Sequence, residues 1–183
     1  TLVEKENLEK AFSILNDYHS RTIYDKQIQN NENDTNLVEK EDQVKAYSLE
    51  TLDGETSWIQ YGQTLEGKNA GDEFGSSVNL NSEGNVVVIG SPGNDESENN
   101  AGKAQVFSYS SVEQTWEQVG SDILGTGSAD GAGTNVSINS TGSRVSVASP
   151  GNDEAGQNKG KIETFQVSLK ANIREFILWE NNP

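Results

Sequence analysis

The hexapeptide Ser-Pro-Gly-Asn-Asp-Glu occurs twice in this chain of 183 residues, at 91–96 and again at 149–154. When the chain is aligned with itself at that offset of 58 positions, the agreement extends from Trp58 to Ser108 without a gap. Of these 51 positions 21 are identical, and they include Trp, Pro and Gly residues that chance similarity would not keep in register. A repeat of this length is typical of a propeller blade or a solenoid unit. The duplication therefore constrains the fold more than any other feature of the chain.

Within each copy, short segments rich in β-forming residues alternate with turn sequences. The turns Asn-Ser-Glu-Gly at 81–84 and Asn-Ser-Thr-Gly at 139–142 end in Gly, for which a positive φ costs little. The pattern predicts a mainly β fold of two four-stranded, blade-like antiparallel units. The strands predicted in the first copy are 58–62, 78–80, 85–90 and 103–109, and the second copy has their equivalents.

The flanks of the repeats differ in composition, because all 18 glycines lie between Gly54 and Gly160. This shift divides the chain into a helical arm and linker (1–53), a first repeat (54–108), a second, divergent repeat (109–168) and an amphipathic tail (169–183). Apolar residues at helical spacing predict an N-terminal helix, and a weaker second helix is predicted over about 37–47. The tail predicts a short C-terminal helix or strand. It is alternatively a decayed third repeat, in which Arg174 takes the place of Trp116.

Composition excludes several classes of function. The net charge of −16 opposes binding to nucleic acid, which depends on Lys and Arg, and to anionic lipid head groups. The longest apolar runs have only four residues, so we expect no membrane-spanning segment. There is no cysteine, and the single histidine, His19, cannot be combined with a nucleophile and an acid into a convincing catalytic set. We expect a protein that is not an enzyme.

The first copy resembles an FG-GAP-type repeat, the blade unit of integrin-α-like β-propellers. The matching elements are the Trp-x-Gln-x-Gly opening at 58–62, Gly-Asp-Glu-Phe-Gly-Ser-Ser-Val at 71–78, the Ser91-Pro92 turn and Gly102-Lys103 before the last strand. The Asn- and Ser-rich composition is most similar to the FG-GAP-like proteins of diatoms and other marine algae. The resemblance extends to the second copy and implies two blades of a β-propeller.

The second copy departs from the pattern, since Ala132 replaces Phe74. Loss of a buried ring costs about 3–5 kcal/mol, so we expect a looser unit or another side chain in its place. A propeller needs at least about four blades to close, whereas this chain has two. Its open edges and faces must then be covered, because they invite unwanted pairing. The blades therefore predict a docking module.

The repeated hexapeptide has two interpretations. In the structural one, Pro fixes φ and Gly-Asn-Asp turns the chain with Asx-type bonds. In the other, the loop binds Ca²⁺, because the resemblance to integrin-like blades implies loops that can supply oxygen ligands. The candidate ligands in the first copy are Asn94, Asp95, Glu96, Glu98 and Asn100. The second loop offers Asn152, Asp153, Glu154 and Asn158, and neither loop has a complete Asp-x-Asp-x-Asp-Gly motif.

Trp58 and Trp116 occupy equivalent repeat positions, so both are expected in blade cores, whereas Trp179 either caps the sheet or anchors a partner. The candidate partner-binding residues are Phe12, Leu15, Tyr18, Phe176 and Trp179. The first functional hypothesis is a non-catalytic subunit that docks on a larger protein assembly. The resemblance to algal proteins implies one possible host, a photosynthetic complex of the thylakoid membrane in the plastid. The protein would bind it peripherally. The alternative is a propeller fragment, secreted or at the cell surface, that uses calcium in adhesion or ligand binding. Its propeller ring would be completed by oligomerisation or by the rest of a longer chain.

Overall fold

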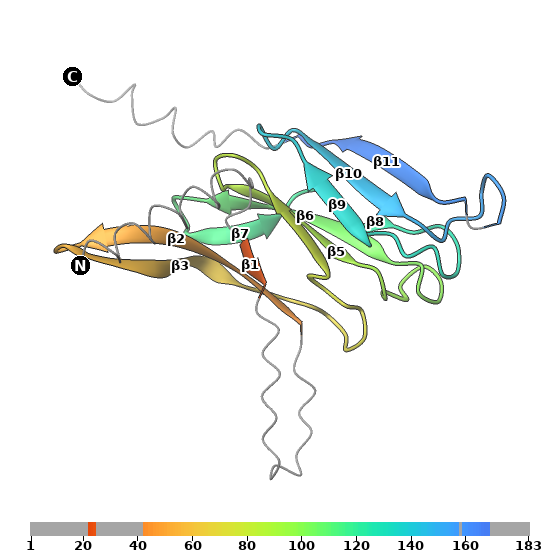
Figure 1. Cartoon of the computed structure of the whole chain (residues 1–183), viewed down its shortest axis with the longest axis horizontal. Helices are drawn as coiled ribbons and strands as arrows, with labels where there is room; N and C mark the ends of the chain where they lie inside the picture. The colour runs from red at the N-terminus through yellow and green to blue at the C-terminus, as the bar shows by residue number, and fades with distance from the viewer. Residues whose placement is uncertain (1–21, 25–41, 158, 169–183) are drawn as a thin grey trace, which may run out of the picture.

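The strands of the chain form three antiparallel sheets that follow one another along the sequence (Figure 1). This computed structural model describes residues 22–24, 42–157 and 159–168. The first sheet has the order β1-β2-β3, the second the order β4-β5-β6-β7 with β8 also paired to β6, and the third the order β11-β10-β9. The strands are β1 (Thr22–Tyr24), β2 (Gln43–Leu52), β3 (Glu55–Glu66), β4 (Ser77–Leu80), β5 (Val86–Ser91), β6 (Lys103–Ser110), β7 (Thr115–Gln118), β8 (Ile123–Leu124), β9 (Asn135–Ile138), β10 (Arg144–Ser149) and β11 (Lys161–Gln166).

The offset of 58 residues found in the sequence relates the sheets to one another. It carries β4, β5 and β6 onto β9, β10 and β11. It also carries the start of β3 onto β7, and these two strands close the first and second sheets by pairing with β2 and β6. In the first and second sheets, one outer strand therefore comes from the beginning of the next copy. The prediction of a mainly β fold with open, blade-like antiparallel units is confirmed.

The helix predicted to reach about residue 47 is wrong from Gln43 onward, where the chain forms β2. Val44 and Ala46 are buried and alternate with less buried neighbours, which is the period-two pattern of a strand rather than the stripe of a helix. Asp53 and Gly54 both have positive φ and form the turn to β3. Thr22–Tyr24, within the predicted helical arm, is also a strand, because it pairs with β2. The remainder of the predicted arm and the tail lie outside the described residues.

Two apolar cores fill the spaces between successive sheets, and the second repeats the first. The core between the first and second sheets contains Leu65, Leu80, Val87, Ile89 and Trp116. Shifting the first four by 58 gives Ile123, Ile138, Val145 and Val147, which all belong to the second core or pack against it. The sequence repeat is therefore also a repeat of packing interfaces, as expected of stacked units that bury their faces against neighbours.

The replacement of Phe74 by Ala132 does not leave an empty space in the second copy. Phe74 and Ala132 are both buried, with exposed fractions of 3% and 2%. Ala132 lies against main chain of the preceding unit, since its N–H donates to the carbonyl of Ala101 at 2.8 Å and it forms a parallel bridge with Gly102. Ala132 belongs to the second apolar core, and main chain of the preceding unit lies beside it.

No helix in the described ranges is long and apolar enough to cross a membrane.

Candidate functional site

The Ser-Pro-Gly-Asn-Asp loop of the first copy is held by a buried amide–carboxylate pair. Asn94 is 2% exposed, and its amide Nδ2 donates to Oδ2 of Asp72 at 2.8 Å. Its own Oδ1 accepts from the N–H of Glu96 at 3.1 Å, which is the Asx-type bond predicted for this turn. The main chain adds a bond from the N–H of Gly93 to the carbonyl of Asp72. The loop is thus fastened to a segment 22 residues earlier in the chain.

The second copy reproduces this arrangement. Asn152 donates to Oδ2 of Asp130 at 2.9 Å and accepts from the N–H of Glu154 at 3.2 Å. The same carboxylate oxygen accepts from the N–H groups of Thr126 and Gly127 at 3.0 and 2.8 Å. Burial alone would raise the pKa of Asp130, but these donors outweigh it and the pKa is lowered. Asp72 and Asp130 were not among the predicted site residues, although their identity at the offset of 58 was visible in the sequence.

The predicted calcium ligands come together in one loop, yet several of them already have partners in the protein. Oδ1 of Asp95 accepts from the N–H of Asn100 at 2.6 Å. Glu96 pairs with Nζ of Lys103 at 3.2 Å, and Glu98 is exposed. Among the described residues no group of three or more His, Cys, Asp or Glu side chains is arranged to hold a metal ion. Calcium binding here stays a prediction.

Lys103 brings a positive charge beside this loop. Its side chain is 5% exposed, and Nζ lies 3.1 Å from Asp122 and 3.2 Å from Glu96. Burial would lower the pKa of Lys103, but the bonds and charges of the two carboxylates raise it. The pKa of Asp122 is lowered because hydrogen bonds from Gln118 and Lys103 exceed the effect of burial. The ammonium group of Lys103 already pairs with Glu96, so a calcium ion would compete with it for that carboxylate.

The two tryptophans at equivalent repeat positions have different environments. Trp116 is 4% exposed, and its backbone N–H and carbonyl are both bound by the amide of Gln63, at 2.8 and 2.7 Å. Its ring packs against Tyr61 and Tyr109, with centroids 5.7 and 5.3 Å away. Trp58 is 45% exposed, so the prediction that it lies in a blade core is wrong. The physical reason is that no preceding sheet covers it among the described residues.

The hairpin of β2 and β3 extends beyond β7 (Figure 1). It carries exposed apolar residues. Trp58 pairs with Leu49 and Ile59 pairs with Ser48, so Trp58 and Ile59 point to opposite faces. Leu52 is 77% exposed and Ile59 is 44% exposed. Three acidic residues surround them, Glu50, Asp53 and Glu55, and all are exposed. We call residues 49–60 the hairpin tip.

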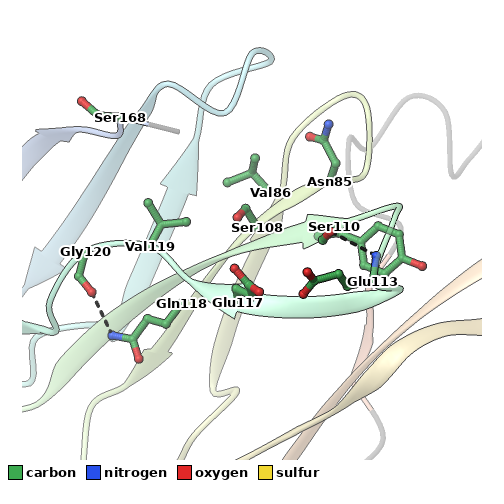
Figure 2. Close-up of a pocket in the computed structure, with 11 residues that line it drawn as sticks. Asn85, Val86, Ser108, Ser110, Glu113, Glu117, Gln118, Val119, Gly120 and Ser168 are labelled. Atoms are coloured by element: carbon green, nitrogen blue, oxygen red, sulfur yellow. Dashed lines mark hydrogen bonds between the residues drawn. The ribbon is translucent and has the colours of Figure 1, made fainter. Parts of the chain in front are cut away.

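A groove lies between the second and third sheets and has two parts that share Val119, Gly120 and Ser168. Figure 2 shows the polar part, of about 360 Å³, where Glu113 and Glu117 lie on the side of the β6–β7 hairpin that also carries Val119. The apolar part, of about 520 Å³, is lined by residues that include Val145, Phe165 and Val167. Sequence reasoning missed this groove, because it depends on the packing of two sheets.

The predicted partner-binding residues Phe12, Leu15, Tyr18, Phe176 and Trp179 all lie outside the described residues.

Comparison with known proteins supports the assignment of the first copy. A family model described as FG-GAP repeat matches residues 64–107, which span the end of β3 to β6. Residues 64–107 are therefore similar to an FG-GAP repeat. A search of curated proteins finds no match for the chain. FG-GAP repeats point to an interaction or propeller-type domain, and such domains are generally non-catalytic. The Asp72–Asn94 pair fastens a loop that lies within these matched residues.

Proposed function

We propose that this protein is a non-catalytic interaction subunit that docks on a larger protein assembly through the hairpin tip. The observation that carries the proposal is the exposure of Trp58, whose repeat equivalent Trp116 is buried between two sheets. This strand position is therefore buried between two sheets in the second copy. In the first copy the described residues leave it exposed. Tryptophan is among the residues that dominate protein interfaces.

The hairpin tip also indicates the chemistry of its partner. Leu52, Trp58 and Ile59 offer apolar surface on both faces of a two-stranded ribbon, which suits a cleft rather than a flat surface. Glu50, Asp53 and Glu55 add negative charge around that surface. A partner protein with an apolar cleft and a basic rim complements both properties, and opposite charges across the rim also accelerate association.

The proposal is tested by capturing partners from native extract with tagged full-length protein. The variant Trp58→Ser/Ile59→Ser removes the apolar contacts, and Val112→Ser, in the exposed β6–β7 turn, is the matched control. We expect the double variant to lose a partner that the wild type and the control retain, with capture weakening at high salt. A set of captured proteins that is identical for all three would refute docking through the hairpin tip.

A peripheral position on an algal photosynthetic membrane complex is a finer proposal, supported by the resemblance of the sequence alone. A second FG-GAP repeat in residues 109–168 is likewise proposed, from the equivalence of β9, β10 and β11 to β4, β5 and β6. The partners captured from a diatom or other algal extract test the first idea. Enrichment of proteins that are unrelated to the photosynthetic membrane would contradict it.

The alternative function, calcium-assisted adhesion or ligand binding, is favoured by the clustering of Asp95, Glu96, Glu98 and Asn100 in one exposed loop. Isothermal titration with millimolar calcium tests it, with Asp95→Asn as the comparison. Binding heat that disappears in the variant would support the calcium hypothesis. No heat and no shift in melting temperature would exclude it.

A further inference from the structure

The third sheet has one face against the second sheet and one face turned away from it. Val145 and Val147 of β10 belong to the apolar core that the third sheet shares with the second. Successive side chains of a strand point to opposite faces, so Arg144, Ser146 and Ala148 lie on the other side. Their partners on β11 complete that side, and they are Gln166, Thr164 and Ile162. We call these six residues the outer face.

The offset of 58 shows which face of the second sheet corresponds to the outer face. It is the face that packs against the third sheet, where four apolar side chains are at most 5% exposed: Val86, Val88, Ala104 and Val106. The equivalent residues of the outer face are Arg144, Ser146, Ile162 and Thr164. Three of these four are polar, and the fourth, Ile162, is 75% exposed. The face that would receive a further unit has therefore lost most of its apolar character.

A second difference concerns how closely main chains can approach the two faces. A Cβ atom added at Gly90 of the second sheet would collide with the carbonyl oxygen of Gly133 in the third unit. Gly90 therefore allows main chain of the third unit to lie directly on the second sheet. The equivalent residue of the outer face is Ala148, whose methyl group takes up this space. A further unit could not stack on the third sheet at the same separation.

The hydrogen bonds of the two faces differ in the same sense. Ser77 of the second sheet donates to the carbonyl of Gly133 at 2.7 Å, and Oδ1 of Asn79 accepts from a main-chain N–H of β9 at 3.0 Å. Both bonds connect the second unit to the third. On the outer face the hydroxyl groups of Ser146 and Thr164 instead bond to each other, at 2.9 Å. These two polar groups are thus paired within their own sheet.

We propose that the outer face is a cap, which stays in water and on which no further blade-like unit stacks, whether from a second copy or from a longer chain. Terminal units of repeat proteins need a polar outer face of this kind for solubility. Burial of Arg144, Ser146 and Thr164 against another sheet would be costly unless each found new partners. The row of sheets can then be extended only at its other end, where the first sheet lies (Figure 1). A closed propeller ring needs contacts at both ends, so the cap opposes ring completion.

Cysteine labelling tests the cap, because the natural chain has no cysteine. The test variant, Thr164→Cys, places a thiol on the outer face. The matched control is Val106→Cys, at the equivalent position on the buried face of the second sheet, and Val112→Cys marks an exposed turn. The rate of labelling by a maleimide is measured on the full chain, from dilute to concentrated solution. Melting temperatures show that each variant folds.

We expect Thr164→Cys to be labelled about as fast as Val112→Cys at every protein concentration, and Val106→Cys to be labelled many times more slowly. Slow labelling of Thr164→Cys in dilute solution would overturn the proposal, because the chain itself would then cover the outer face. Labelling that becomes slow only in concentrated solution would overturn it too, since a second copy would then stack there.

A second variant tests the cause directly, because Arg144→Val/Ser146→Val/Ala148→Gly/Thr164→Val restores the residues of the second sheet at these positions. We expect it to self-associate more strongly than the wild type in light scattering, since a large exposed apolar face promotes association. Arg144→Gln/Thr164→Ser keeps the outer face polar and should behave like the wild type. A fourfold variant that associates no more than the wild type would contradict the cap. The hairpin tip is unchanged in these variants, so this result and the docking experiment can fail separately.

Discussion

At the residue scale, the Asn of the repeated hexapeptide is explained by a buried carboxylate to which it donates in each copy. Asn94 and Asn152 are buried and donate to Asp72 and Asp130 at nearly equal distances. Buried polar groups need partners, because an unpaired donor or acceptor away from water is costly. The conservation of Asn and Asp between two otherwise divergent copies therefore has a structural cause, whichever function the loops perform.

Replacing Asn152 by Ala should destabilise the protein by about 1–3 kcal/mol, because a buried carboxylate loses a donor and the N–H of Glu154 loses its acceptor. Urea unfolding measures this change. Gln157→Ala, in the exposed part of the same loop, is the matched control and should leave the free energy of unfolding unchanged within about 0.5 kcal/mol. Equal effects of the two substitutions would contradict the assigned role of Asn152.

Asp130 should contribute an acid-dependent part of the stability. Its pKa is lowered in the folded protein, so its contribution is fully present above the unfolded-state pKa and is lost as pH falls through the lower folded-state pKa. Asp130→Asn should therefore be less stable than the wild type at neutral pH, and the difference should shrink as the solution becomes strongly acidic. Unfolding curves across this range test the sign. A difference that stays constant down to the lowest pH would contradict it.

At the element scale, the pattern of β-forming segments and Gly-containing turns predicted β4 to β7 and β9 to β11 well, but it missed the two-residue strand β8. It did not predict that an outer strand of the first and second sheets comes from the next copy, because that depends on contacts between copies rather than on local pattern. The helix predicted up to residue 47 failed for a related reason: β2 is stabilised by pairing with β3, a partner that local periodicity does not show. Of the candidate site, the loops were predicted, whereas the groove and the hairpin tip were not.

The two equivalent tryptophans should differ in their effect on stability. Trp116→Ala removes a ring that is 4% exposed and packed between two tyrosines, so we expect a loss of about 3–5 kcal/mol. Trp58→Ala removes a ring that is 45% exposed, and its cost should be below about 1 kcal/mol. Denaturant unfolding of both variants provides the comparison. Similar losses would show that the two positions are buried alike.

At the scale of the whole molecule, the described sheets form a row that does not close on itself. The first sheet ends in a hairpin tip with an exposed Trp58, and a groove lies between the second and third sheets. We propose that a partner protein covers the hairpin tip. We propose that the open row of sheets is what allows the protein to dock on a partner.

Oxidative footprinting of tryptophan in the full chain tests the central claim most directly, because mass spectrometry resolves Trp58 and Trp116 as separate peptides. In the free protein we expect Trp58 to be oxidised many times faster than Trp116, and in the captured complex we expect Trp58 to become protected. If Trp58 is already as slow as Trp116 in the free chain, the protein covers its own hairpin tip and the proposed docking surface does not exist.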